Sequence, residues 1–252
     1  EAGIASPPST MDEFIADTKK LTKADGSQYG FALPDNGFTL GWSILQWANG
    51  GDILDDKGCS VLDSDANKAT FQTWGELVSK DKVSPVGLDA PAGENLFSTS
   101  KAAMIVGGPW LVETFKKAGV DYGVTTMPVG SAGPVTAIST VPFMISKATK
   151  HPEEAAEFLT WWTGETAQAQ FSKEAGFPPV RTDMSADASN EMLKPFTDGL
   201  ADGKLVMPAQ SKAAQITSDV YEPLLGKVMR GEDVATLVAD ATMQINTITG
   251  CK

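Results

Sequence analysis

Residues that build metal sites and nucleophilic catalytic centres are scarce in this sequence. It has one histidine, His151, and two cysteines, Cys59 and Cys251, among 252 residues. A structural zinc site takes about four Cys or His ligands, and a Ser–His–Asp or Cys–His centre needs a histidine beside its nucleophile. His151 stands instead at a predicted helix start, before Pro152. The sequence therefore predicts no metal site, no cofactor and no catalytic residues.

Long apolar runs, basic patches and phosphate-binding loops are also missing. No apolar run approaches the roughly 20 residues that cross a bilayer, and the glycines of 107–108 and 130–133 match neither GxxxxGK[ST] nor GxGxxG. The formal net charge of −12 is spread along the chain, which argues against nucleic acid or an anionic membrane surface as a partner. The absence of a long apolar run leads us to expect a soluble protein. Because neither an initiating Met nor a signal peptide is present, we expect that any export signal was removed or never included.

The residues that are present centre on 101–127, KAAMIVGGPWLVETFKKAGVDYGVTTM. The pattern predicts a buried strand over Ala102–Val106, a turn at Gly107-Gly108-Pro109, a helix over Trp110–Ala118 and a second strand over Tyr122–Met127. Ligands of α/β proteins bind where strand ends meet helix starts. There the glycines let a ligand come close to the backbone, and Trp110 offers a flat apolar face. The stretch predicts a stacking site for a small polar ring; the alternative is that Trp110 is a half-buried packing residue.

A second segment carries residues suited to the same kind of cleft. Asn36, Phe38 and Trp42 follow a strand predicted over Tyr29–Leu33 and the turn that ends it. Aromatics after a strand-end turn are well placed to line a cleft. We therefore expect Asn36 to offer a hydrogen bond to a ligand, and Phe38 and Trp42 to form apolar walls.

A third segment is the loop over residues 175–181, which Gly and Pro residues make stiff. Phe177 offers an apolar face there, and Arg181 offers a forked hydrogen-bond donor. The functional interpretation is that both residues reach a ligand. The alternative is a rigid connector in which Arg181 pairs with a nearby acid.

Local patterns predict several other elements. Residues Thr10-Met11-Asp12-Glu13 form a capping box that opens a helix expected to run to Asp25-Gly26. Residues 53–62 form a hairpin, and short strands follow over Val135–Ile138 and Phe143–Ser146. A helix is expected to begin at Pro152, since proline suits a first helical turn.

The two cysteines, Cys59 and Cys251, lie far apart in the sequence. They either form a disulfide, which would stabilise the fold by roughly 4–5 kcal/mol in the chain-entropy model, or are two unrelated thiols. Their spacing does not decide between these alternatives.

Several stretches together resemble one protein family. They are GGPW with the helix and YGVTTMP that follow it, DNGFTLGW, GGDILDDKG, and the succession ISKATKHPEEAAEFLTWWTGE. These stretches resemble the extracellular solute-binding proteins of ABC transporters, the group that includes the maltose-binding proteins. The resemblance covers essentially the whole chain. It implies an α/β fold with periplasmic-binding-protein-like (type II) lobes, a mixed sheet flanked by helices, and a Trp110 that stacks on bound sugar.

The resemblance also implies how the chain is divided into lobes. Residues 1–140 and 204–252 correspond to the carboxyl-terminal α/β lobe, and residues 141–203 to the hinge strand and helical remainder of the amino-terminal lobe. In relatives the amino-terminal lobe begins with about 100 residues, on the order of one domain. These residues have no counterpart before Glu1. Residues 1–4 resemble the tail of a helix. We therefore expect a partial chain with one incomplete lobe.

The function implied by the resemblance is capture of a sugar or oligosaccharide between two lobes and its delivery to an ABC permease in the membrane. We expect a monomer outside the cytoplasm, in the periplasm or lipid-anchored as a lipoprotein at the cell surface. One departure puts a long maltodextrin ligand in doubt. Maltodextrin binders carry another aromatic in the segment that corresponds to Pro208–Thr217, where this sequence has Ala213 and Ala214, which cannot stack. The expected ligand-binding residues are Trp110, Gly108, Gly107, Phe38, Trp42, Asn36, Phe177 and Arg181.

Other classes of protein also use aromatic platforms. A glycoside hydrolase would need two carboxylates about 5–10 Å apart across the scissile bond. The acids nearest the predicted cleft loops are Asp35, Asp52 and Glu94, and no motif singles out a pair of them. A carbohydrate-binding module would use the aromatics without catalysis, and an interaction scaffold would expose them without a small-molecule pocket.

Overall fold

The computed structural model describes residues 2–184 and 191–251, which form two compact units. The larger unit comprises Glu1–Val106, Met127–Ala137 and Asp202–Lys252, and the smaller unit comprises Gly107–Thr126 and Ile138–Ala201. The predicted division into lobes, with boundaries at 140 and 204, stays a prediction, because a compact unit of this chain need not coincide with a lobe of the complete protein.

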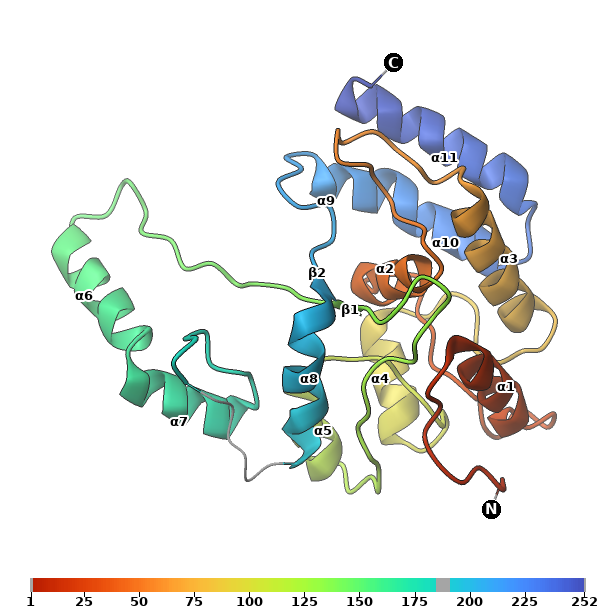
Figure 1. Ribbon diagram of the computed structural model, residues 1–252, viewed down its shortest axis with the longest axis horizontal. Coiled ribbons are helices and arrows are strands. Elements are labelled where there is room, and N and C mark those ends of the chain that lie inside the picture. The colour runs from red at the N-terminus through yellow and green to blue at the C-terminus, as the bar shows by residue number, and fades with distance from the viewer. Residues whose placement is uncertain (1, 185–190, 252) are drawn as a thin grey trace. The chain divides into compact units, whose positions relative to one another are not determined.

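The larger unit is built mainly of helices. Its last two long helices lie side by side and pack on α3, as Figure 1 shows in blue and ochre. The helical elements are α1 (Met11–Leu21), α2 (Thr39–Ala48), α3 (Asp65–Ser79), α4 (Ala90–Ser98), α9 (Ala213–Ile216), the π-helical turn η3 (Thr217–Tyr221), α10 (Glu222–Met229) and α11 (Val234–Thr249).

Helix α1 shows how local sequence sets these elements. The predicted capping box is confirmed, because the Thr10 side chain accepts from Glu13 N while the Glu13 side chain accepts from Thr10 N. The helix ends earlier than expected, at Leu21. Thr22 ends it, since its hydroxyl donates to Thr18 O at 2.8 Å and accepts from Gly30 N at 3.1 Å. Residues 2–4, expected as the tail of a helix, are not helical, and Glu1 lies outside the described residues.

Strand pairing in the larger unit is sparse. The segments predicted as strands around residues 29–33 and 102–106 do lie parallel, with Ala103 N donating to Tyr29 O and Ala32 N to Met104 O, both at 2.9 Å. They form isolated bridges, not a continuous ladder. The two-stranded sheet joins β1 (Thr136–Ala137) to β2 (Gly203–Lys204), also in parallel. The result is a helix-rich α/β architecture with a small sheet.

The core of the larger unit is rich in aromatic rings. Phe14, Phe31 and Trp74 contact one another with ring centroids 5.1–5.6 Å apart. A buried polar network crosses the same core, because the Tyr221 hydroxyl donates to Gln46, whose amide donates to Asn67 at 2.6 Å. Burial is the main reason that the pKa of Tyr221 lies well above its ordinary value. Every polar group of this network therefore has a partner, as a low-dielectric interior requires.

The predicted hairpin is confirmed and carries one of the cysteines. Leu54 bridges Ser60 antiparallel, and Asp55 N donates to Cys59 O at 2.8 Å. Cys59 is bonded to Cys251, which follows α11, with Cα atoms 5.6 Å apart and a sequence separation of 192. The structure thus selects the disulfide over two separate thiols and ties the hairpin to the end of the last helix.

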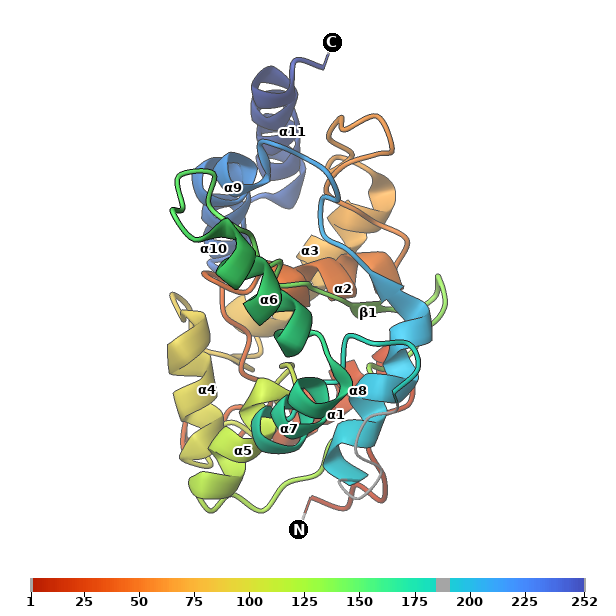
Figure 2. The same cartoon turned by 90° about the vertical axis from the view of Figure 1, so that its left-hand side faces the viewer.

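The helices of the smaller unit are less buried than those of the larger unit. Its elements are α5 (Trp110–Lys117), α6 (Pro152–Trp162), α7 (Glu165–Ala175), η1 (Glu191–Leu193), α8 (Lys194–Asp198) and η2 (Gly199–Asp202), the last of which ends in the larger unit. Helices α6 and α7 follow one another closely in the chain (Figure 2). No residue of α6 is buried, and Phe158 and Trp161 are 49% and 57% exposed. Among the described residues, no helix combines the length and the apolar character needed to cross a membrane.

Two of the expected strands are wrong. Within the described residues, 122–127 and 143–146 form no ladder. Tyr122 packs on α5 instead: its hydroxyl donates to Val112 O at 2.6 Å, and its ring lies edge-on to Phe115 at 5.7 Å. Residues 143–146 are exposed. A strand needs a neighbouring strand to satisfy its backbone groups, and apolar sequence alone does not supply one.

Candidate functional site

The turn before α5 has the form that the sequence predicted. Both glycines lie close to side chains of the helix that follows, because an added Cβ would lie 2.3 Å from the Leu111 side chain at Gly107 and 2.0 Å from the Trp110 ring at Gly108. The helix then begins at Trp110, which is 45% exposed, while the three residues of the same helix that are buried are Leu111, Val112 and Phe115. A large, half-exposed aromatic therefore stands at a tight turn, as a stacking platform requires.

Trp110 has an aromatic neighbour from the loop after α7. The rings of Trp110 and Phe177 are stacked, with centroids 6.0 Å apart and planes inclined by 25°. Phe177 is in turn stacked on Phe171 of α7, at 5.5 Å and 13°. The structure therefore brings together two of the residues that the sequence assigned to the site.

Arg181, expected as a ligand donor or as half of an ion pair, forms the ion pair. Its Nε and Nη2 donate to the two carboxylate oxygens of Asp183 at 2.8 and 2.5 Å. The hydrogen bond from Arg181 lowers the pKa of Asp183, and the same contact raises the pKa of Arg181. The bidentate pairing leaves Arg181 Nη1 for Thr163 O, at 3.5 Å. In this structure Arg181 acts as a connector of the loop.

The residues predicted after the first strand lie in the larger unit. Asn36 is exposed, and its backbone carbonyl accepts from Ala90 N at 3.1 Å. Phe38 is half-buried and packs against the core, with its ring over Gly41, where an added Cβ would come within 2.1 Å. Both residues keep surface that a ligand could use.

Trp42 is different, and its prediction as a cleft wall is corrected here. Its side chain is 0% exposed, and its indole Nε1 donates to Pro34 O at 2.8 Å. Its ring packs on Phe71 in the core, at 6.0 Å. A ring without accessible surface cannot contact a solute, so Trp42 supports the strand-end turn from below. The sequence pattern of α2 did not reveal that Trp42 is buried. Eight of the ten residues of this helix, Gly41 to Ala48, are buried, so no exposed face can be recognised from the pattern.

Gln168 of α7 is a residue that the sequence did not single out. It is 2% exposed, and both ends of its amide are used. Nε2 donates to Trp162 O at 2.9 Å, and Oε1 accepts from Val180 N at 3.1 Å. Glutamine on a helix is usually a surface residue, so no sequence pattern could have marked it.

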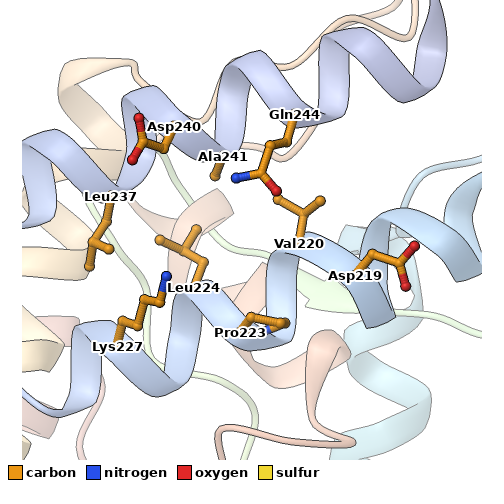
Figure 3. A pocket seen from close by; sticks show the side chains of 9 residues that line it. All are labelled: Asp219, Val220, Pro223, Leu224, Lys227, Leu237, Asp240, Ala241 and Gln244. Carbon is orange, nitrogen blue, oxygen red and sulfur yellow. The ribbon is translucent and has the colours of Figure 1, made fainter.

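Two hollows lie elsewhere on the described residues. One, of about 120 Å³, lies between α10 and α11 and is shown in Figure 3, where Asp219, Lys227, Asp240 and Gln244 surround an apolar floor. The other, of about 270 Å³, lies between residues 143–149 and α6. None of the predicted ligand residues lines either hollow.

The fold is that of solute-binding proteins. A solute-binding protein of an ABC transporter from Thermotoga lettingae, bound with alpha-D-tagatose, superposes with a TM-score of 0.87 at 23% identity, over 98% of this chain and 67% of that one. A cyclo/maltodextrin-binding protein complexed with maltotetraose gives 0.80 at 21% identity, over 98% and 66%.

Sequence comparison places the chain more exactly. Residues 1–169 match the family described as bacterial extracellular solute-binding protein, and the chain belongs to that family. A binding protein of Brucella abortus is 29% identical over 251 residues, 94% of this chain and 60% of the relative. The galactooligosaccharide-binding protein of Bacillus subtilis is 28% identical over 69% of this chain and 44% of its own length. The chain thus spans about three fifths or less of these relatives. The family consists of solute-binding proteins, which are not enzymes. Membership in it therefore speaks against the alternative of a glycoside hydrolase.

Proposed function

We propose that the protein is the substrate-binding component of an ABC importer, which captures a sugar or oligosaccharide in a cleft between two lobes and delivers it to a membrane permease. The observation that carries the proposal is Trp110, a half-exposed indole held at a Gly-Gly-Pro turn and backed by Phe177. Relatives named for galactooligosaccharide and maltotriose binding support a carbohydrate as the solute. The description of the family as extracellular supports a site of action outside the cytoplasm. We propose the periplasm, or the cell surface on a lipid anchor.

Capture requires contacts of two kinds. Trp110 supplies the apolar face on which a sugar ring stacks, and Phe38 supplies a second apolar surface. Asn36 and the backbone at Gly107 and Gly108 supply hydrogen bonds to hydroxyl groups. Hinge closure then presents the loaded form to the permease. Phe177 and Arg181 enter the proposal through the loop that they build, and Trp42 is left out because it is buried.

Helix α9 bears on the size of the solute, because it lacks an aromatic side chain on which a further sugar ring could stack. Ala213 and Ala214 begin this helix. The resemblance described above implies that maltodextrin binders carry another aromatic in this segment. A methyl side chain cannot stack on a sugar ring, so fewer rings can be held at once. We therefore propose a monosaccharide, a short oligosaccharide or a polar sugar derivative in place of a long maltodextrin.

The proposal also covers helix α6 of the smaller unit. Apolar side chains of α6 stand exposed, including Phe158 and Trp161, and soluble monomers rarely expose contiguous apolar patches of more than a few hundred Å². The relatives are longer than this chain. We propose that additional polypeptide completes the amino-terminal lobe by covering α6, and that the complete protein is a monomer.

The proposal is tested with full-length protein and a panel of maltotriose, a galactooligosaccharide and D-tagatose. At least one sugar should release calorimetric heat and change tryptophan fluorescence without being consumed. Appearance of a hydrolysis product would contradict a binding role, and the absence of heat with every sugar in the panel would count against carbohydrate as the solute.

Replacement of the platform gives the sharper prediction. Trp110→Ala should weaken binding of the responsive sugar by about 1–3 kcal/mol, because stacking on the indole is lost. Met243→Ala is the control, since it removes an exposed apolar side chain of α11 that lies outside the site. Equal affinities of the two variants, measured by calorimetry, would remove Trp110 from the site.

A further inference from the structure

Trp110 is the first ring of a continuous series within the smaller unit. Phe177 stacks on it, Phe171 stacks on Phe177, and Trp162 contacts Phe171 with ring centroids 5.1 Å apart. Trp162 is also stacked on Phe158, at 6.3 Å and 20°. The indole at the turn is therefore connected by ring contacts to α7 and α6.

The loop that carries Phe177 is fitted closely to the turn that carries Trp110. Gly176 ends α7 with a φ of +76°, in the left-handed region that favours glycine. An added Cβ at Gly176 would lie 3.2 Å from Pro109 O, tighter than an ordinary contact. The backbone conformation favours glycine here, and the close approach leaves little room for a side chain. The stacking of Phe177 on Trp110 is therefore accompanied by a close backbone contact between Gly176 and Pro109.

Gln168 fixes the other end of this loop. It is buried, it accepts from Val180 N, and it donates to the carbonyl of Trp162 at the end of α6. Burial of an amide is costly unless its donor and acceptor are both paired. Gln168 therefore clamps the loop after α7 to the end of α6. It holds this loop at Val180, three residues beyond Phe177.

We infer that Phe177 and Gln168 are positioning residues for Trp110: Gln168 clamps the loop, and Phe177, held by that loop, fixes the orientation of the indole by stacking on it. Because Phe177 covers part of one face of the indole, a solute stacks on the surface that Phe177 leaves open. The consequence for solute binding rests on the proposed function, whereas the fixed orientation of Trp110 does not.

The orientation of Trp110 is tested without any ligand. The near-ultraviolet circular dichroism of Trp110 is obtained as the difference between each chain and its Trp110→Phe counterpart. Phe177→Leu and Gln168→Met should each lose most of this signal, while far-ultraviolet spectra stay unchanged. Phe177→Tyr keeps the ring and should keep the signal, and Gln170→Met removes an exposed glutamine of the same helix as a matched control.

The two variants are independent, so a failure of Phe177→Leu to fold leaves Gln168→Met as the test. An unchanged Trp110 signal in a folded Phe177→Leu or Gln168→Met chain would overturn the corresponding assignment. An equal loss in Gln170→Met would show that the effect is not specific to the clamp.

Binding to the responsive sugar of the panel, measured on full-length protein, tests the consequence for the solute. Phe177→Leu should lower the affinity about two- to tenfold, the size expected from one aromatic pair. Since Phe177 acts through Trp110, the same change should have little further effect in a Trp110→Ala background. Additive losses would overturn the positioning role and make Phe177 a direct contact. If no sugar binds the unaltered protein, the proposed function fails while the dichroism still decides the inference.

Discussion

The two units treat their tryptophans in opposite ways. In the larger unit Trp42, Trp47 and Trp74 are at most 4% exposed and lie in a core shared by several helices, whereas in the smaller unit Trp110 and Trp161 are about half exposed. The larger unit uses its rings to hold itself together. The smaller unit keeps its rings available, one at the candidate site and others along α6. Burial therefore separates residues that stabilise from residues that can bind, even where the residue type is the same.

The strongest test of this comparison is a matched pair of truncations. Trp42→Ala should lower the free energy of unfolding by about 3–5 kcal/mol, because it leaves a cavity and an unpaired Pro34 carbonyl in the core. In this 252-residue chain, where Trp161 is 57% exposed, Trp161→Ala should change it by no more than about 0.5 kcal/mol. Denaturant unfolding followed by far-ultraviolet circular dichroism measures both. Similar losses in the two variants would mean that α6 is packed as tightly as α2.

The disulfide should give the next largest effect, again confined to the larger unit. Replacing Cys59 and Cys251 together by Ser should lower the free energy of unfolding by about 2–5 kcal/mol, because the unfolded chain is no longer cross-linked over a long loop. The reduced wild-type protein should match the double variant in thermal unfolding. A reduced protein as stable as the oxidised one would show that the bridge carries no stability.

Helix caps should give the smallest difference. Thr10→Ala removes the capping box of α1 and should cost about 1 kcal/mol. His151, at the corresponding position of α6, makes no side-chain cap, so His151→Ala should leave stability nearly unchanged. Thermal unfolding of the two variants makes the comparison. An equal loss in both would mean that His151 contributes something beyond the observed contacts.

Helices were the predictable part of this fold. Signals such as the Thr10 and Glu13 pair, or proline at the first turn of α6, act within a few residues, so their positions followed from the sequence. Strands depend on a distant partner. The apolar run at 143–146 has the composition of a strand and lies exposed, since composition does not specify which segment will pair with it.

The candidate site was predictable to a different extent. Resemblance to a family pointed to Trp110 and to the loop with Phe177, and these two residues do meet. The same reasoning could not distinguish the buried Trp42 from an exposed indole, because exposure depends on the whole core. Gln168 could not be found at all, since its role arises from two backbone groups in other segments that fold around it.

The larger unit is discontinuous, and this has a consequence for its biosynthesis. Its third piece begins only at Asp202 and supplies α10 and α11, which pack on α3. A chain emerging from the ribosome therefore makes the whole smaller unit before the core of the larger one can close. Cys251, near the carboxyl end of the sequence, can reach Cys59 only after that. Formation of the bridge therefore requires the first and third pieces of the larger unit to be present together, and a chain that stops before residue 251 leaves Cys59 without its partner.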